Sequence, residues 1–197
     1  MKNLILVAIV AFAVPAFSHE HDHSDDHSIL TKSRVTLATA TSLEMFEDGQ
    51  IGQLWGFETL KADDEASAKI LYIDQNNTGR ISGYDCHFHS HGGADEAHCH
   101  DAAELGTVAA PTDALTFQVD AFLESLVSAL DTFERKIAPV EKITAVKMWQ
   151  YSDMIHTSFT HEAATGKVQS HFMCHIHDGI HIDCHRSRNP GPQEPKF

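Results

Sequence analysis

One pattern of residues occurs twice in this chain, at an offset of 87 positions that grows to 88 after a single insertion. A fixed order of matches at a nearly constant offset is typical of a duplicated structural unit. We therefore expect two homologous halves, residues 29–101 and 113–186, joined by a linker at 102–112. The matching segments are SLEMFE and ALDTFE (42–47 and 129–134), TGRI and TGKV (78–81 and 165–168), CHFH and CHIH (86–89 and 174–177), and the closing pairs Cys99-His100 and Cys184-His185.

The hydrophobic pattern of each half predicts a helix followed by short strands. Between residues 113 and 137, apolar side chains recur at helical spacing, with Thr112 or Asp113 as cap and Pro139 as stop. The matching helix of the first half runs from Val35 to Asp48-Gly49. The expected class is α+β, with each helix packed on a small antiparallel β-meander that carries a Cys/His hairpin. The expected strands are 68–73, 80–89, 97–101, 155–161, 167–177 and 180–186.

The chain begins with a lysine and an apolar run that ends in small residues, a pattern typical of a cleaved export signal over residues 1–18. No later segment is apolar for long enough to span a membrane. We therefore expect a secreted, extracellular or periplasmic protein. Its formal net charge of −14 argues against nucleic acid as a partner and suits cations. Residues 19–28 and 187–197 are expected to be disordered tails.

The four cysteines fall in two short motifs, one in each half. In an exported chain, cysteines are paired as disulfides by default. Two strands that alternate faces place the cysteines among apolar residues, which favours the pairs Cys86–Cys99 and Cys174–Cys184. Thiolate ligation of a metal by the same residues remains an alternative.

The histidines of both motifs fall on the strand face opposite the cysteines. Neutral imidazoles gathered on one face are the ligands that zinc, copper and nickel prefer, whereas calcium and magnesium prefer oxygen. Metal binding should weaken as the pH falls through about 6.5, because a protonated imidazole cannot ligate. The candidate metal ligands are His87, His89, His91, His98, His100, His175, His177, His181, His185 and Asp183.

The segments CHFHSHGGADEAHCH and CHIHDGIHIDCH, each following a Thr-Gly turn, resemble the Cys/His segments in the extracellular extensions of fungal ZIP-family zinc transporters. The resemblance covers about 15 residues in each half, and the loop after His89 is longer than in that pattern. It implies zinc binding outside the cytoplasm. It implies no transport activity, because the chain lacks membrane spans. The matching positions are His87, His89, His98, His175, His177 and His181.

The segment HEHDHSDDH, at residues 19–27, is a further metal-binding candidate. Cleavage after Ser18 would place His21 third from a free amine, where copper or nickel binds in square-planar nitrogen geometry together with His19. The alternative is a flexible tail that scavenges metal through its histidines.

Together these features predict an exported metal-binding protein that buffers, scavenges or delivers Zn²⁺, with Cu²⁺ or Ni²⁺ as alternatives. A membrane metal transporter is a candidate partner. No catalytic motif accompanies the histidines, so we do not expect an enzyme. Two alternatives remain open. One is a mono- or dinuclear metalloenzyme, and the other is a disulfide-stabilised envelope or interaction domain with incidental histidines.

Overall fold

The structure is a computed structural model, and it describes residues 27–49, 52–62, 65–73, 79–91, 94–108, 115–177, 181–192 and 194–195. Within that part, each half of the chain runs through a helix and then four strands. The expected α+β class is confirmed. The first half comprises a 3₁₀ turn (His27–Thr31), α1 (Arg34–Gly49), β1 (Gln53–Ala62), β2 (Glu65–Ile73), β3 (Gly79–His91) and β4 (Ala94–Val108). The second comprises α2 (Val119–Lys136), a 3₁₀ turn (Val140–Lys142), β5 (Ile143–Tyr151), β6 (Met154–Ala163), β7 (Gly166–His177) and β8 (His181–Ser187).

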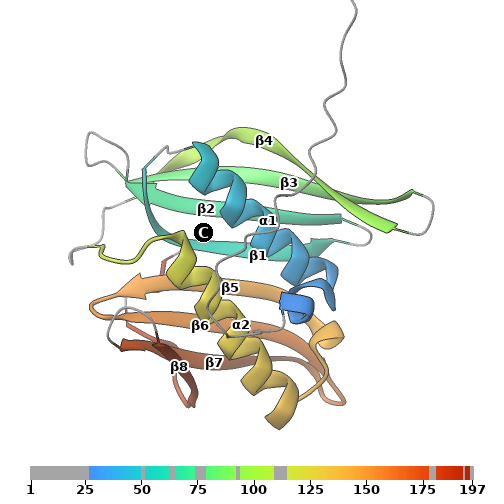
Figure 1. Cartoon of the computed structure of the whole chain (residues 1–197), viewed down its shortest axis with the longest axis vertical. Helices are drawn as coiled ribbons and strands as arrows, with labels where there is room; N and C mark the ends of the chain where they lie inside the picture. Colours follow the sequence, from blue (N-terminus) through green and yellow to red (C-terminus); the bar gives the residue numbers. More distant parts are fainter. Residues whose placement is uncertain are drawn as a thin grey trace, which may run out of the picture.

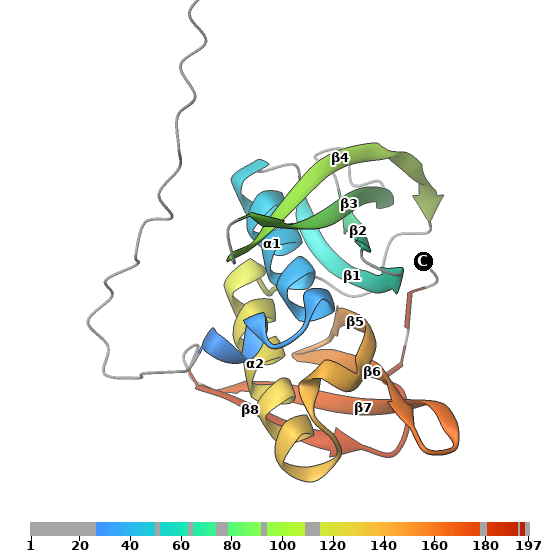
Figure 2. The same ribbon diagram turned by 90° about the vertical axis from the view of Figure 1, so that its right-hand side faces the viewer.

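All eight strands form one antiparallel sheet in the order β4-β3-β2-β1-β5-β6-β7-β8. Each half contributes four consecutive strands, and the two sets meet where β1 pairs with β5. Both helices lie side by side on one face of this sheet (Figure 1). Figure 2 shows the same arrangement from the side, with β4 and β8 at the two edges. The two expected meanders are therefore joined into one continuous sheet.

The central strands β1 and β5 were missing from the sequence prediction. Both are buried along much of their length, so neither alternates cleanly between apolar and polar residues. Phe57 and Met148 pair across these strands and are fully buried on the helix side, whereas Trp55 and Trp149 are buried on the other. A strand covered on both faces loses the period-2 signal by which a half-exposed strand is recognised.

α2 has the apolar stripe that the sequence predicted, but the predicted start was wrong. Its N-cap is Gln118, and residues 115–118 are non-helical. The side chain of Gln150 accounts for this local structure, because its Oε1 accepts hydrogen bonds from the backbone N–H groups of Thr116 and Phe117 at 2.8 and 3.0 Å. A buried amide on β5 therefore holds the segment extended before the helix begins.

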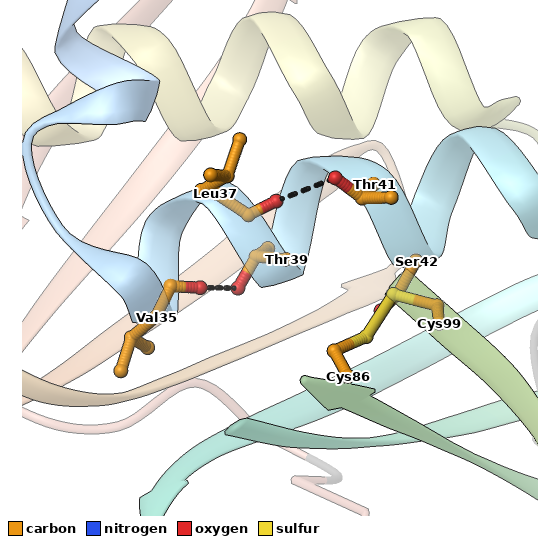
Figure 3. Close-up of a disulfide and its surroundings, with 7 residues drawn as sticks. All are labelled: Val35, Leu37, Thr39, Thr41, Ser42, Cys86 and Cys99. Atoms are coloured by element: carbon orange, nitrogen blue, oxygen red, sulfur yellow. Dashed lines mark hydrogen bonds between the residues drawn. A yellow bond between two sulfur atoms is a disulfide. The ribbon is translucent and has the colours of Figure 1, made fainter. Parts of the chain in front are cut away.

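α1 forms where expected despite its many threonines. Thr39 and Thr41 donate hydrogen bonds to the backbone carbonyls of Val35 and Leu37, at 2.8 and 3.0 Å (Figure 3). These bonds satisfy the hydroxyls inside the helix. A threonine-rich segment can therefore be buried against the sheet without leaving polar atoms unpaired.

Two ends of the fold differ from the sequence prediction. β4 continues to Val108, into the stretch expected to be a linker. Beyond β8, the described residues of the expected C-terminal tail lie against the sheet face opposite the helices (Figure 2). There the Trp149 indole donates a hydrogen bond to the Pro192 carbonyl at 3.1 Å, and Lys147 pairs with Glu194 at 2.9 Å. These contacts explain why this segment is held to the fold.

Candidate metal centre

Both expected disulfides are present, and with them all four cysteines are paired. Each bond joins residues that lie directly opposite each other, Cys86 and Cys99 on β3 and β4, and Cys174 and Cys184 on β7 and β8. The thiolate-ligand alternative is not the arrangement in this structure. The disulfides instead fix the register of the two hairpins that carry the histidines.

Each disulfide lies on the helix side of the sheet, against a serine. Ser42 Oγ of α1 is 3.3 Å from Cys86 Sγ (Figure 3). The sulfurs of Cys174 and Cys184 lie 3.7 and 3.4 Å from the carbonyl oxygen of Ser125 in α2. Successive strand residues point to opposite faces, so the residues next to these cysteines point away from the helices.

On the β3–β4 hairpin, His87, His98 and His100 occupy the face away from the helices. His87 is directly opposite His98, and Asp85 is opposite His100. The rings of His87 and His100 are 5.7 Å apart between centroids. Nδ1 of His87 is 3.0 Å from Oε1 of Glu65 on β2, a contact of the kind that fixes the orientation of metal-ligating histidines.

The β7–β8 hairpin repeats this arrangement with a closer pair of rings. His175 and His185 are nearly parallel, with centroids 5.1 Å apart, and His177 lies 6.2 Å from His175. Asp183 is exposed and opposite His175. Of the remaining candidates, His19 and His21 lie outside the described residues, and the side chains of His89, His91 and His181 are also outside what is described.

The two hairpins lie far apart. Four strands separate β3 from β7 in the sheet. At the usual spacing of neighbouring strands, this is about 24 Å along the sheet. Because β1 and β5 are antiparallel, the two meanders run in opposite directions, so the hairpin tips point to opposite ends. Within one chain, the described histidines of the two motifs therefore form separate clusters.

Among the side chains that the structure describes, no three histidine, cysteine, aspartate or glutamate groups converge in a geometry ready to hold a metal ion. In the described clusters, imidazole rings contact one another, and carboxylates lie at the margins. The side chains of three further candidates, His89, His91 and His181, are not among those described.

Sequence reasoning missed His156, which is the most buried histidine on the face away from the helices. It is 1% exposed and stacks on Trp149, with ring centroids 5.3 Å apart. Neither ring nitrogen has a hydrogen-bond partner within the described residues. Burial, and secondarily the charge of His175, lowers the pKa of His156 to about 4. Strand alternation from Ile155 would have placed it on this face.

The C-terminal segment covers His156. A Cβ added at Gly191 would collide with the imidazole, so the absence of a side chain allows the backbone to lie directly on the ring. On the helix side, His161 is also buried, and its Nε2 is 3.1 Å from Ser170 Oγ. Burial lowers the pKa of His161 and of His171.

No helix among the described residues is long and apolar enough to cross a membrane. No protein-family model, curated protein or solved structure matches this chain.

Proposed function

We propose that this chain is an exported metal-binding protein that buffers, scavenges or delivers Zn²⁺, with Cu²⁺ or Ni²⁺ as alternatives. Each disulfide-closed hairpin holds one ion through its imidazoles. A membrane metal transporter is the proposed partner. The two disulfides are compatible with an extracellular location. The zinc preference also rests on the resemblance of both motifs to extracellular segments of ZIP-family transporters.

The observation that carries this proposal is a pair of contacting imidazoles on the outer face of each hairpin, with a disulfide behind them on the helix side of the sheet. The ring centroids are 5.7 Å apart for His87 and His100, and 5.1 Å apart for His175 and His185. Two imidazoles at such distances need a modest side-chain rotation to bind one ion. The remaining ligands come from neighbouring histidines, Asp183 or water.

We propose two separate sites, and the position of the hairpins at opposite edges of the sheet supports this. We also propose that the two halves are homologous. Both run helix and then four strands, and in both a disulfide joins the third strand to the fourth. Duplication of a one-ion unit explains why a histidine-rich face occurs twice.

Native mass spectrometry of the zinc-loaded protein at pH 7.5 tests this proposal. The histidines at 19, 21, 23 and 27 are first replaced by glutamine, which leaves the hairpins as the only histidine clusters in question. We expect two zinc ions per chain. The paired change His87→Gln and His100→Gln removes one ion, and His175→Gln with His185→Gln removes the other.

The matched control is Glu162→Gln, an exposed carboxylate change at the far end of β6 from the β7–β8 hairpin tip. It should leave two ions bound. A chain that retains no zinc, or one that keeps both ions in each paired variant, would rule out the hairpin sites. Loss of both ions in one paired variant would mean that the halves share a site.

A further inference from the structure

A cavity of about 470 Å³ opens at the corner where β8 ends beside β7. β8 pairs with β7 only as far as Ser187, opposite His171. The preceding residues of β7, 166–170, therefore have β6 on one side and no β8 residue on the other. The cavity is lined by Gln169, Ser170, His171, Arg186, Ser187 and Arg188.

The charge of this cavity differs from that of the chain as a whole. The formal net charge is −14, yet two of the five arginines, Arg186 and Arg188, line this one cavity. Within the described part of the chain, neither guanidinium forms an ion pair with a carboxylate. Glu194 lies close enough to act on His171, but its carboxylate is bound by Lys147 Nζ at 2.9 Å.

One of the residues that line the cavity, His171, has a buried polar atom without a partner among the described residues. Nδ1 of His171 is buried and has no hydrogen-bond partner among the described residues. A buried unpaired polar group is costly, and in native structures it commonly marks the place of a bound water or ion. The neighbouring Ser170 also lines the cavity, and its hydroxyl lies 3.1 Å from His161 Nε2.

We propose that this cavity binds a small molecule through a phosphate or sulfate group. A guanidinium presents N–H donors in a planar fork that matches the oxygens of such a group, and two guanidiniums supply charge compensation for a dianion. The volume falls in the range of small-molecule sites, which leaves room for an organic part beyond the anion. This site uses none of the histidines assigned to metal binding and is independent of that proposal.

Isothermal titration calorimetry at pH 7.5 tests the cavity with three probes, namely sodium phosphate, sodium sulfate and phenyl phosphate. The full chain is first stripped of metal with a chelator, so that a metal held by the histidines cannot bind the anion. We expect saturable binding of at least one probe. The double change Arg186→Gln and Arg188→Gln should weaken it at least tenfold.

Two further variants sharpen the test. Arg80→Gln is the control, because this exposed arginine lies on β3, with five strands between it and β8, so binding should be unchanged. The double change Arg186→Lys and Arg188→Lys keeps the charge but loses the planar fork, so the affinity of this variant should lie between those of the wild-type chain and the glutamine variant. Circular dichroism checks that each variant is folded.

Tighter binding of phenyl phosphate than of phosphate would identify an ester as the ligand, and equal binding would identify the free oxyanion. Both outcomes support the cavity as an anion site. The absence of saturable binding by all three probes would overturn the proposal. Equal affinity in the wild-type chain and the double glutamine variant would also overturn it.

Discussion

At the scale of single residues, His156 is a titratable side chain that the fold buries almost completely. Its ring lies between Trp149 and the backbone at Gly191, with Tyr151 and His175 as the other titratable neighbours. Neither ring nitrogen reaches a described hydrogen-bond partner, so protonation places an uncompensated charge in a buried site. The folded protein therefore holds this imidazole neutral.

This burial predicts a loss of stability in mild acid. In the unfolded chain an imidazole titrates near 6.5, whereas in the fold the pKa of His156 is lowered to about 4. Between these values the unfolded state binds a proton that the folded state does not. The contribution of the neutral His156 imidazole to the free energy of unfolding is therefore complete above pH 6.5, and it falls by about 3 kcal/mol as the pH drops to 4. Urea unfolding from pH 7.5 to 4.5 measures it.

The comparison uses two variants. His156→Leu should remove that amount from the pH dependence of the free energy of unfolding. His177→Gln changes an exposed histidine and should leave this pH dependence unchanged. The pKa values of His161 and His171 are also lowered, and their contribution to the pH dependence of stability stays the same in both variants. Identical pH profiles for the wild-type chain and His156→Leu would contradict the argument.

At the scale of elements, the disulfide hairpins are the units that combine the apolar core with the histidine face. Cys174 is fully buried and Cys184 nearly so, next to Ser125 of α2. In the other hairpin, Cys86 is fully buried next to Ser42 of α1. Each bridge is thus anchored by its own helix, and the two hairpins lie at opposite edges of the sheet.

We predict that the two disulfides contribute to stability independently. They close segments with sequence separations of 13 and 10 residues. Loops of this length correspond to about 3 kcal/mol of lost unfolded-state entropy. Replacing each cysteine pair by alanines should cost about that amount, and the quadruple variant should show the sum to within about 0.5 kcal/mol. Chemical denaturation of the four chains measures this. A coupling well above 1 kcal/mol would mean that the hairpins are energetically linked.

At the scale of the whole molecule, the β1–β5 pairing makes two meanders into one sheet with one core. Phe57 on β1 lies opposite Met148 on β5 and contacts Phe122 of α2, with ring centroids 6.1 Å apart. A side chain of the first half is therefore packed against both a strand and the helix of the second. The main core cluster includes residues from both helices and from both sets of strands.

This shared core predicts a large cost for truncating Phe57. The side chain is fully buried at the junction of the halves, so Phe57→Ala should lower the free energy of unfolding by about 3–5 kcal/mol. Leu60→Ala is the control on the same strand, because Leu60 is 37% exposed and should cost less than about 1 kcal/mol. Equal costs for the two variants in urea unfolding would show that the halves do not depend on this junction.

The sequence alone was sufficient for everything that depends on local periodicity. Alternation along a strand sorted Cys174 to the helix face and His175 to the other, and it gave both cysteine pairings. Helical spacing gave the apolar stripe of α2, and the Thr-Gly match predicted the turn that ends at Gly166, whose φ of 109° suits glycine. These features are set by neighbours within a few residues in the chain.

Only the tertiary structure determined what depends on contacts between distant segments. β1 and β5 lack alternation because their second faces are covered, by Leu115 and Leu71 at Trp55 and by the C-terminal segment at Trp149. The start of α2 depends on Gln150, more than 30 residues away. The burial of His156 arises in the same way, because it depends on the backbone at Gly191, 35 residues further along the chain.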